Sequence, residues 1–287
     1  MRVKPAKLQT TVAQPAGAEG VGLHTGLRVR FHLTEAAADE GIVIIRADLE
    51  GSPCIYVRPE SVRRGALQRR TELVGEAGAI VATLEHLLAA CLGLGLDNVR
   101  VWVDGPEMPI FDGSALPYVE VIREAGLTSL EAPRRAWRLR QPVTLINGNA
   151  EIMAVPAEQM ELAFFAEFPH EGMASQSAAL ALESEDFARC LAPARTFCFY
   201  EEVEPLLEAG LIRGGSMDCA IVIREGRPLG GDYRLPNELA CHKLVDLIGD
   251  LAVLGRPVKA LITARGSGHA LNHAFIEMLR KELVEDE

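Results

Sequence analysis

The stretch Ala240–Leu251, ACHKLVDLIGDL, combines an apolar helical pattern with three polar residues spaced four apart. Its leucine, isoleucine and valine residues predict a helix that packs on a core. Residues i, i+4 and i+8 of a helix lie nearly above one another, so His242, Asp246 and Asp250 share one face. His242 and Asp246 could chelate one divalent ion, but a catalytic zinc site needs a third protein ligand. Without such a ligand, the pair would be an ordinary surface hydrogen bond.

Outward from this stretch, strand-like and helical patterns alternate in both halves of the chain. In the first half we expect strands over 27–33, 41–49 and 96–105, and helices over 83–96 and 115–127. In the second half we expect strands over 141–148, 150–157, 161–169, 218–226 and 258–266, with helices from Phe187, over 240–251 and over 270–287. Both halves thus offer several strands and about two helices.

This repetition predicts an α+β fold of two similar domains, each a β-sheet layered with two helices. The first domain would span residues 1–128 and the second residues 136–287. The polar, proline-containing segment near 127–136 is expected to be a linker. A single interwoven α+β domain is the alternative.

Charge and cysteine content narrow the class of protein. The 287 residues are 48% hydrophobic, which is enough for buried cores, and the formal charge of −11 is spread without a basic block. Nucleic acid and anionic membranes are therefore not expected partners. The six cysteines include no CxxC pair, and no segment offers about twenty continuous apolar residues. We expect reduced thiols, a cytoplasmic location and no stable membrane insertion.

Two further histidines extend the candidate metal site. His86 lies on a predicted helix of the first half with Glu85 beside it, and His269 lies in a glycine-flanked turn after a strand. In a metal hydrolase the ion lowers the pKa of a water molecule, a carboxylate takes the proton, and a histidine serves the leaving group or the developing charge. The residue types alone are thus compatible with a metal hydrolase, but they do not identify its substrate.

Eight short motifs, in consistent order along nearly the whole chain, resemble the UDP-3-O-acyl-N-acetylglucosamine deacetylases, zinc amidases of the committed step of lipid A synthesis. They are GVGLHTG, TLEHLLAA, LGLDN, PIFDGSALPYV, ARTF, GGSMDCAIV, HKLVDLIGDL and SGHALNH. Each motif alone is weak, but eight in register are very specific. The resemblance implies deacetylation of a UDP-linked 3-O-(3-hydroxyacyl)-N-acetylglucosamine with release of acetate. We expect the chain to be a monomer.

The resemblance implies zinc held by His86, His242 and Asp246, although iron could occupy such a site too. Because these ligands come from both halves, the active site would lie in the cleft between the domains. Glu85 corresponds to the general base that activates the water. His269 corresponds to the protonated partner that stabilises charge or protonates the leaving amine.

Three residues near these positions receive supporting roles. Asp250 could accept a hydrogen bond from His269 and keep that ring cationic, with a helix-surface carboxylate as the alternative. Thr196, in ARTF, matches the hydroxyl that helps to stabilise the oxyanion. Lys243 should point about 100° away from the neighbouring ligand around the helix, towards the sugar or diphosphate of the substrate.

Apolar residues are expected to contact the uracil and the acyl chain. Phe168 resembles the aromatic residue beside the uracil, with a core phenylalanine as the alternative. The segment near 197–217 resembles the insert that forms the acyl-chain passage. Its candidate lining residues are Phe197, Tyr200, Val203, Leu207 and Ile212. These side chains could equally belong to an ordinary core.

Other positions limit the resemblance. His24, in the glycine-rich GVGLHTG, is expected to be a hydrogen-bonding structural residue rather than a fourth ligand. Cys241 stands where many family members carry a basic residue, residues 63–82 lack the usual glycine- and threonine-rich pattern, and 148–150 lack a lysine found in some members. Two alternatives therefore stay open: a zinc amidase acting on another N-acyl sugar, and a non-catalytic paralogue that binds a nucleotide sugar.

Overall fold

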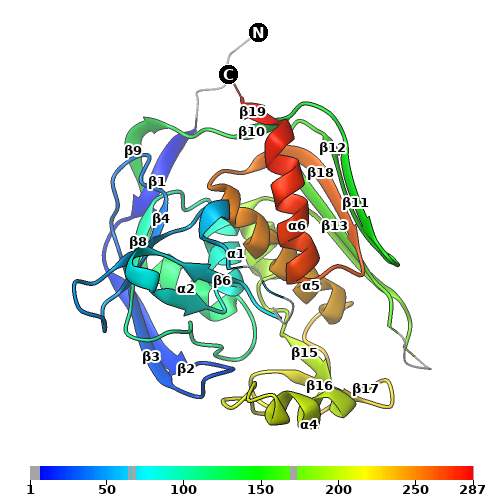
Figure 1. Ribbon diagram of the computed structural model, residues 1–287. Coiled ribbons are helices and arrows are strands. Elements are labelled where there is room, and N and C mark those ends of the chain that lie inside the picture. The colour runs from blue at the N-terminus through cyan, green and yellow to red at the C-terminus, as the bar shows by residue number, and fades with distance from the viewer. Residues whose placement is uncertain (1–6, 64, 66–68, 169–172, 287) are drawn as a thin grey trace.

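Two β-sheets form the outer layers of the molecule, and helices lie between them (Figure 1). The computed structural model describes residues 7–63, 65, 69–168 and 173–286. This arrangement confirms the α+β class with a sheet and helices in each half. Within the described residues, no helix combines the length and apolar character needed to cross a membrane.

The first half contains a five-stranded sheet in the order β2-β3-β8-β4-β5. These strands are β2 (Ala16–Val21), β3 (Arg28–Thr34), β4 (Ile42–Arg46), β5 (Cys54–Tyr56) and β8 (Val99–Val103). Along β3, Val29, Phe31 and Leu33 are buried while the residues between them are exposed, as the two-residue period of a strand requires. Helices α1 (Glu85–Leu94) and α2 (Leu116–Ala125) pack with these residues in one apolar core.

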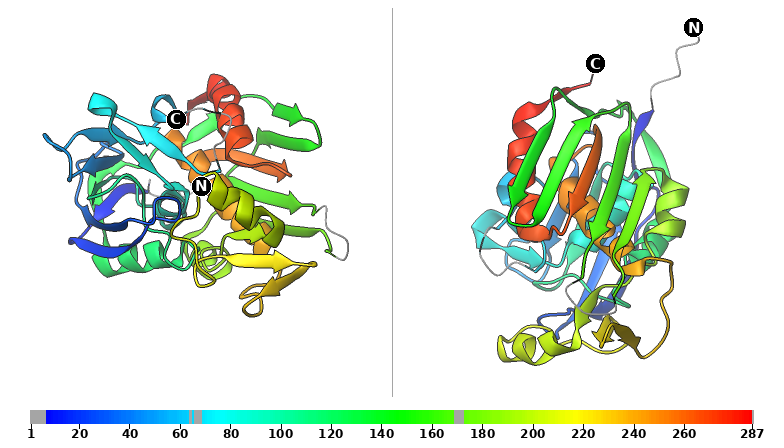
Figure 2. Two further views of the ribbon diagram at one scale, coloured as in Figure 1. Left: turned by 60° about the horizontal axis from the view of Figure 1, so that its bottom comes forward. Right: turned by 90° about the vertical axis from the view of Figure 1, so that its right-hand side faces the viewer.

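The second half contains a seven-stranded sheet around the central strand β18 (Val258–Arg265), which pairs with β10, β12 and β13. The other strands are β10 (Trp137–Leu139), β11 (Val143–Asn147), β12 (Ala150–Pro156), β13 (Met160–Ala166), β14 (Gln176–Ala181) and β19 (Leu283–Glu285). Helices α5 (Glu238–Leu251) and α6 (His269–Leu279) cover the inner face of this sheet, and the other face is uncovered (Figure 2, right).

Helices α1 and α5 pack against each other where the halves meet, and one buried apolar cluster extends through both halves. Gly249 lies on the contacting face of α5. A Cβ at this position would clash with the main-chain carbonyl of Glu85. A glycine therefore lets the two helices approach closely enough to bring their polar residues together.

Smaller elements complete the structure. They are β1 (Leu8–Val12), β6 (Glu72–Val74), β7 (Ile80–Ala82), β9 (Leu127–Pro133), α3 (Ser184–Cys190), β15 (Phe197–Phe199), α4 (Tyr200–Glu208), β16 (Ile221–Arg224) and β17 (Arg227–Leu229), with 3₁₀ turns at Pro59–Ser61, Glu76–Gly78, Ala252–Leu254 and Arg280–Glu282. Strands β15, β16 and β17 form a separate small sheet that lies beside α4 at the bottom of Figure 1.

Two expectations about elements were wrong. Residues 127–133 of the expected linker form β9, which pairs antiparallel with β1. This strand is mostly exposed, so it lacks the apolar alternation by which strands are recognised. The expected helix over 270–287 ends at Leu279, and Leu283–Glu285 form β19, which pairs with β10. A distant pairing partner thus outweighs the local helical pattern.

Candidate active site

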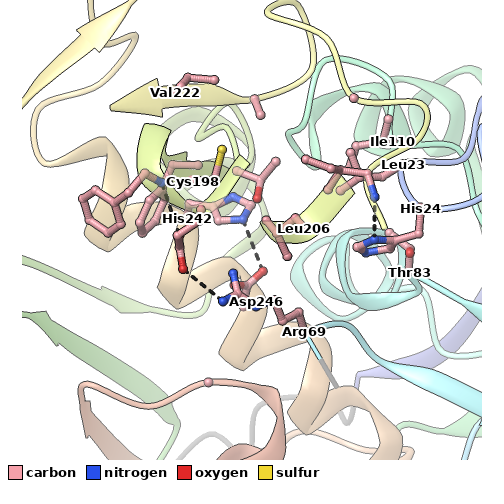
Figure 3. Close-up of a pocket in the computed structure, with 18 of the residues that line it drawn as sticks. Leu23, His24, Arg69, Thr83, Ile110, Cys198, Leu206, Val222, His242 and Asp246 are labelled. Atoms are coloured by element: carbon pink, nitrogen blue, oxygen red, sulfur yellow. Dashed lines mark hydrogen bonds and ion pairs between the residues drawn. The ribbon is translucent and has the colours of Figure 1, made fainter. Parts of the chain in front are cut away.

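A cavity of about 860 Å³ opens beside the contact between α1 and α5, and residues of both halves line it (Figure 3). First-half residues in its wall include Leu23, His24, Arg69, Thr83, Glu85, His86 and Ile110. Second-half residues include Thr196, Phe197, Val203, Leu206, Leu207, Ile212, His242, Lys243, Asp246 and His269. Polar groups converge at one end of an otherwise largely apolar cavity, which is typical of a small-molecule site.

Among the residues that the structure describes, His86, His242 and Asp246 form the one group of three that could hold a metal ion. One ligand atom of each lies within 4.8 Å of the others. Asp246 Oδ1 is 3.4 Å from His242 Nε2 and 3.8 Å from His86 Nε2. The structure thus brings together the three expected ligands, one from α1 and two from consecutive turns of α5.

The protonation states of this group suit a cation. His242 Nδ1 lies 3.1 Å from the carbonyl oxygen of Ala194 and can only donate to it, so Nε2 keeps its lone pair. Burial lowers the pKa of both histidines, that of His86 to about 3. Burial opposes ionisation of Asp246, but Lys243 and the histidines outweigh it and lower its pKa. Two neutral imidazoles and one carboxylate are a common donor set for catalytic zinc.

Glu85 begins α1 beside the candidate ligand His86, and its side chain is buried. Its Oε2 accepts a 3.0 Å hydrogen bond from the main-chain N–H of Thr71, and its Oε1 lies 3.9 Å from His269 Nε2. Burial, opposed by His269 and assisted by Asp246, raises the pKa of Glu85 to about 7. A carboxyl group with this pKa can both accept and return a proton near neutral pH.

His269 begins α6, and its ring faces the carboxylate of Asp250. The Nδ1 atom lies 2.8 and 3.0 Å from the two carboxylate oxygens. Burial lowers the pKa of His269, but Asp250 outweighs it and raises that pKa to about 9. Asp250 is fully buried, so the alternative of a helix-surface carboxylate was wrong.

Lys243 does not point away from the metal-ligand group as expected. Its ammonium donates a 2.7 Å hydrogen bond to Asp246 Oδ2, and 22% of its side chain is exposed. The long flexible side chain of Lys243 can bend back towards Asp246, and the buried carboxylate attracts its positive charge. Lys243 also lines the cavity, so its contact with substrate stays a prediction.

Thr196, which is expected to stabilise the oxyanion, lines the cavity. Of the residues expected to contact the acyl chain, Phe197, Val203, Leu207 and Ile212 line it too. Two others lie elsewhere. Phe168 packs edge-on against Phe197 and Phe199, at 6.2 and 6.4 Å between ring centroids, which fits the core alternative. Tyr200 is 48% exposed, and the Arg224 guanidinium lies 4.7 Å from its ring centroid.

His24 has the expected structural contacts. Its main-chain N–H donates to the Glu107 carboxylate at 2.9 Å, and its Nδ1 accepts from the Ile212 N–H at 3.5 Å. Burial lowers the pKa of His24 to about 4, so the ring is neutral. It takes no part in the group of three candidate ligands.

Of the positions that depart from the family pattern, Cys241 and residues 148–150 do not line the cavity, whereas Arg69, within residues 63–82, does. Cys241 is buried, with Sγ 3.7 Å from the Pro236 carbonyl oxygen, and residues 148–150 lie at the turn between β11 and β12. Of residues 63–82, positions 64 and 66–68 lie outside the described residues, and 72–82 include the hairpin of β6 and β7.

Sequence reasoning missed two buried residues of this site, Thr71 and Glu107. Thr71 contacts Glu85 and Asp250, which are 14 and 179 positions away in the chain. Glu107 accepts hydrogen bonds from the main chain of His24 and from the Thr83 hydroxyl. Glu107 could have been predicted as a buried, hydrogen-bonded residue, because it is an acidic residue within the apolar run PEMPIF. The sequence around Thr71 gives no such indication.

Comparison with known proteins matches residues 9–281 to the family model described as LpxC, UDP-3-O-acyl N-acetylglycosamine deacetylase. Three curated relatives carry the name UDP-3-O-acyl-N-acetylglucosamine deacetylase. The protein of Phenylobacterium zucineum (strain HLK1) is 45% identical over 273 residues, covering 94% of this chain and 92% of its own length. That of Myxococcus xanthus (strain DK1622) is 40% identical over 275 residues, covering 96% and 87%. That of Thermosynechococcus vestitus (strain NIES-2133 / IAM M-273 / BP-1) is 41% identical over 279 residues, covering 97% and 96%.

Proposed function

Because the chain belongs to the UDP-3-O-acyl N-acetylglycosamine deacetylase family, we propose that His86, His242 and Asp246 bind its catalytic zinc ion. The chain is an amide hydrolase that deacetylates UDP-3-O-acyl-N-acetylglucosamine in lipid A biosynthesis. The observation that carries the metal assignment is the buried cluster of two neutral imidazoles and one carboxylate. Ferrous iron has similar ligand preferences and is the second candidate.

When bound, the ion would polarise the amide carbonyl and lower the pKa of a water molecule. The chain supplies the proton transfers. Glu85 accepts the proton of the attacking water at Oε1, because Oε2 already accepts from Thr71. Acetate and a free amine are the products.

Two residues act on the charge that develops during attack. The cationic ring of His269, held by Asp250, stabilises the negative carbonyl oxygen together with the Thr196 hydroxyl. The leaving amine receives its proton from Glu85 or from His269. Both can reach the same space, since Glu85 Oε1 and His269 Nε2 lie 3.9 Å apart.

The cavity beyond this polar end suits the rest of the substrate. We propose that the acyl chain lies along Val203, Leu206, Leu207 and Ile212, which form an apolar wall. Lys243 and Arg69 also line the cavity, and we propose that they contact the diphosphate of the substrate. All six cysteines are free thiols, which is consistent with the cytoplasmic location that we propose.

A deacetylation assay on the purified protein tests this function. Turnover of the UDP-linked substrate should be lost with a chelator and return with added zinc. Glu85→Gln should bind zinc and yet lose at least about a hundredfold in kcat, since general-base catalysis is worth about 10²- to 10⁴-fold. Near wild-type turnover in this variant would refute the assignment of Glu85 as the base. If the protein turned over a simple N-acetyl sugar faster than the UDP-linked substrate, the proposed substrate would be wrong.

A further inference from the structure

Thr71 lies between the two carboxylates that control proton transfer in the proposed site. Its main-chain N–H donates to Glu85 Oε2 at 3.0 Å, and its hydroxyl donates to Asp250 Oδ1. Thr71 is fully buried. One residue therefore contacts both the proposed base and the carboxylate that holds His269.

The remaining polar contacts of Thr71 fix its orientation. Its carbonyl oxygen accepts from the Leu84 N–H at 3.4 Å, which continues the pairing of β6 with β7. Its Oγ1 also lies 3.0 Å from His273 Nε2. A hydroxyl has one hydrogen, so if Thr71 donates to Asp250, then His273 donates to Thr71. The hydroxyl is thus held on both sides.

These contacts join the two halves of the chain at the site. Thr71 and Glu85 belong to the first half, whereas Asp250 lies on α5 and His269 and His273 lie on α6. Asp250 also accepts a 2.7 Å hydrogen bond from the Asn272 side chain. Loss of the Thr71 hydroxyl would therefore leave Asp250 bound to α6 while removing its link to the first half.

We propose that Thr71 is a positioning residue that fixes Glu85 relative to the Asp250–His269 pair. This inference rests on the function proposed above. Both groups must reach one substrate amide, and misplacement by about 1 Å can cost about a hundredfold in rate. Thr71 contacts no candidate metal ligand through a hydrogen bond in the described structure, so metal binding should not depend on its hydroxyl.

The substitution Thr71→Val tests the hydroxyl, because valine keeps the main-chain N–H and nearly the same shape. We expect kcat to fall about 10- to 100-fold while KM changes less than about twofold, as for other partners that orient catalytic groups. Zinc content should equal that of the wild type. Thr71→Ser, which restores the hydroxyl, should recover kcat to within about fivefold.

Thr11→Val is the matched control. The Thr11 hydroxyl is also buried and accepts a 2.9 Å hydrogen bond from Ala36, but it lies on β1. Both valine variants should lose similar thermal stability, and only Thr71→Val should lose kcat. If Thr71→Val does not fold, Thr71→Ala and Thr71→Ser provide the same comparison.

Three results would overturn the inference: kcat of Thr71→Val within twofold of wild type, equal impairment of Thr71→Ser, or loss of zinc in parallel with kcat. The proposed function fails separately. If the wild type does not deacetylate the substrate, the function is wrong, and if Glu85→Gln is fully active, the assignment of Glu85 as the base is wrong. If both of those tests succeed and Thr71→Val is unaffected, only the inference fails.

Discussion

The charge of His269 depends most on Asp250, a buried residue of another helix. Burial alone would lower the pKa of this histidine, and Asp250 reverses the shift and raises the pKa to about 9. A raised histidine pKa means that the cation persists at neutral pH and is lost as pH rises through about 9. The active protonation state is therefore available over the physiological range.

We predict that Asp250→Asn moves the alkaline limb of the pH profile of kcat/KM to lower pH. The neutral amide removes the largest of the effects that raise the pKa of His269, while Asp246 and Glu85 remain, so His269 loses its proton at lower pH. The measurement is the pH profile of wild type and variant. Asp104→Asn, which removes a carboxylate paired with Arg30 on the surface, is the control and should leave the limb in place. An unmoved alkaline limb in Asp250→Asn would contradict the role of His269.

The metal-ligand group gives a second prediction at this scale. His86→Ala removes one of three ligands, so the zinc content of the purified protein should fall from about one per chain to near zero. Elemental analysis measures this directly. His32→Ala is the control, because His32 is exposed on β3 and stacks on Trp102. Full zinc occupancy in His86→Ala would exclude the proposed ligand set.

At the scale of elements, Glu107 fixes the segments on either side of the cavity. It accepts main-chain hydrogen bonds from His24 and Thr25, at 2.9 and 2.8 Å, and a 2.9 Å bond from the Thr83 hydroxyl. Thr83 has φ of 58°, a conformation that costs a β-branched residue about 1–3 kcal/mol. Glu107 thus holds a strained residue two positions before Glu85, the first residue of α1.

Glu107→Gln should lower the free energy of unfolding by about 1–3 kcal/mol at pH 7. Burial raises the pKa of Glu107, but the donors from His24, Thr25 and Thr83 outweigh it and lower that pKa. A lowered carboxyl pKa stabilises the fold above the unfolded pKa of about 4.3 and ceases to do so as pH falls through the folded value.

The difference between wild type and Glu107→Gln should therefore shrink as pH falls below about 4. Denaturant unfolding at several pH values measures it. Glu19→Gln, at an exposed carboxylate paired with Arg28, should show almost no difference at any pH. A difference for Glu107→Gln that stays constant with pH would contradict the assignment.

The contact between α1 and α5 supplies the fourth prediction. Gly249→Ala places a methyl group against the Glu85 carbonyl, so the helices must separate. We expect a loss of about 1–3 kcal/mol of stability together with weaker zinc binding. Gly65→Ala is the control, since a methyl group there meets no atom of the described residues within 4 Å. Unchanged zinc affinity in Gly249→Ala would show that the helix spacing does not control the site.

At the scale of the whole molecule, local patterns predicted much of the fold and of the site. The apolar spacing around His86 and His242 predicted both central helices, and the motifs contained the candidate metal ligands. Residues whose partners are distant were not predictable in this way. Strand β9 lacks apolar alternation because it is mostly exposed. The partners of Thr71 lie on three helices that are distant in sequence from one another or from Thr71. Lys243 was misjudged because helix geometry fixes the direction of Cβ but not of a long flexible side chain.

The pairing of β1 with β9 has a consequence for the order of synthesis. Strand β9 ends at Pro133, so the first half meets all the partners of its own strands before the second half is made. It can therefore fold while the ribosome is still at work, because domains commonly fold as units from the N-terminus. His86 is then in place, but α5 with His242 and Asp246 is translated much later. Metal capture would thus be a late event, and a nascent chain that ends before α5 would hold only one of the three candidate ligands.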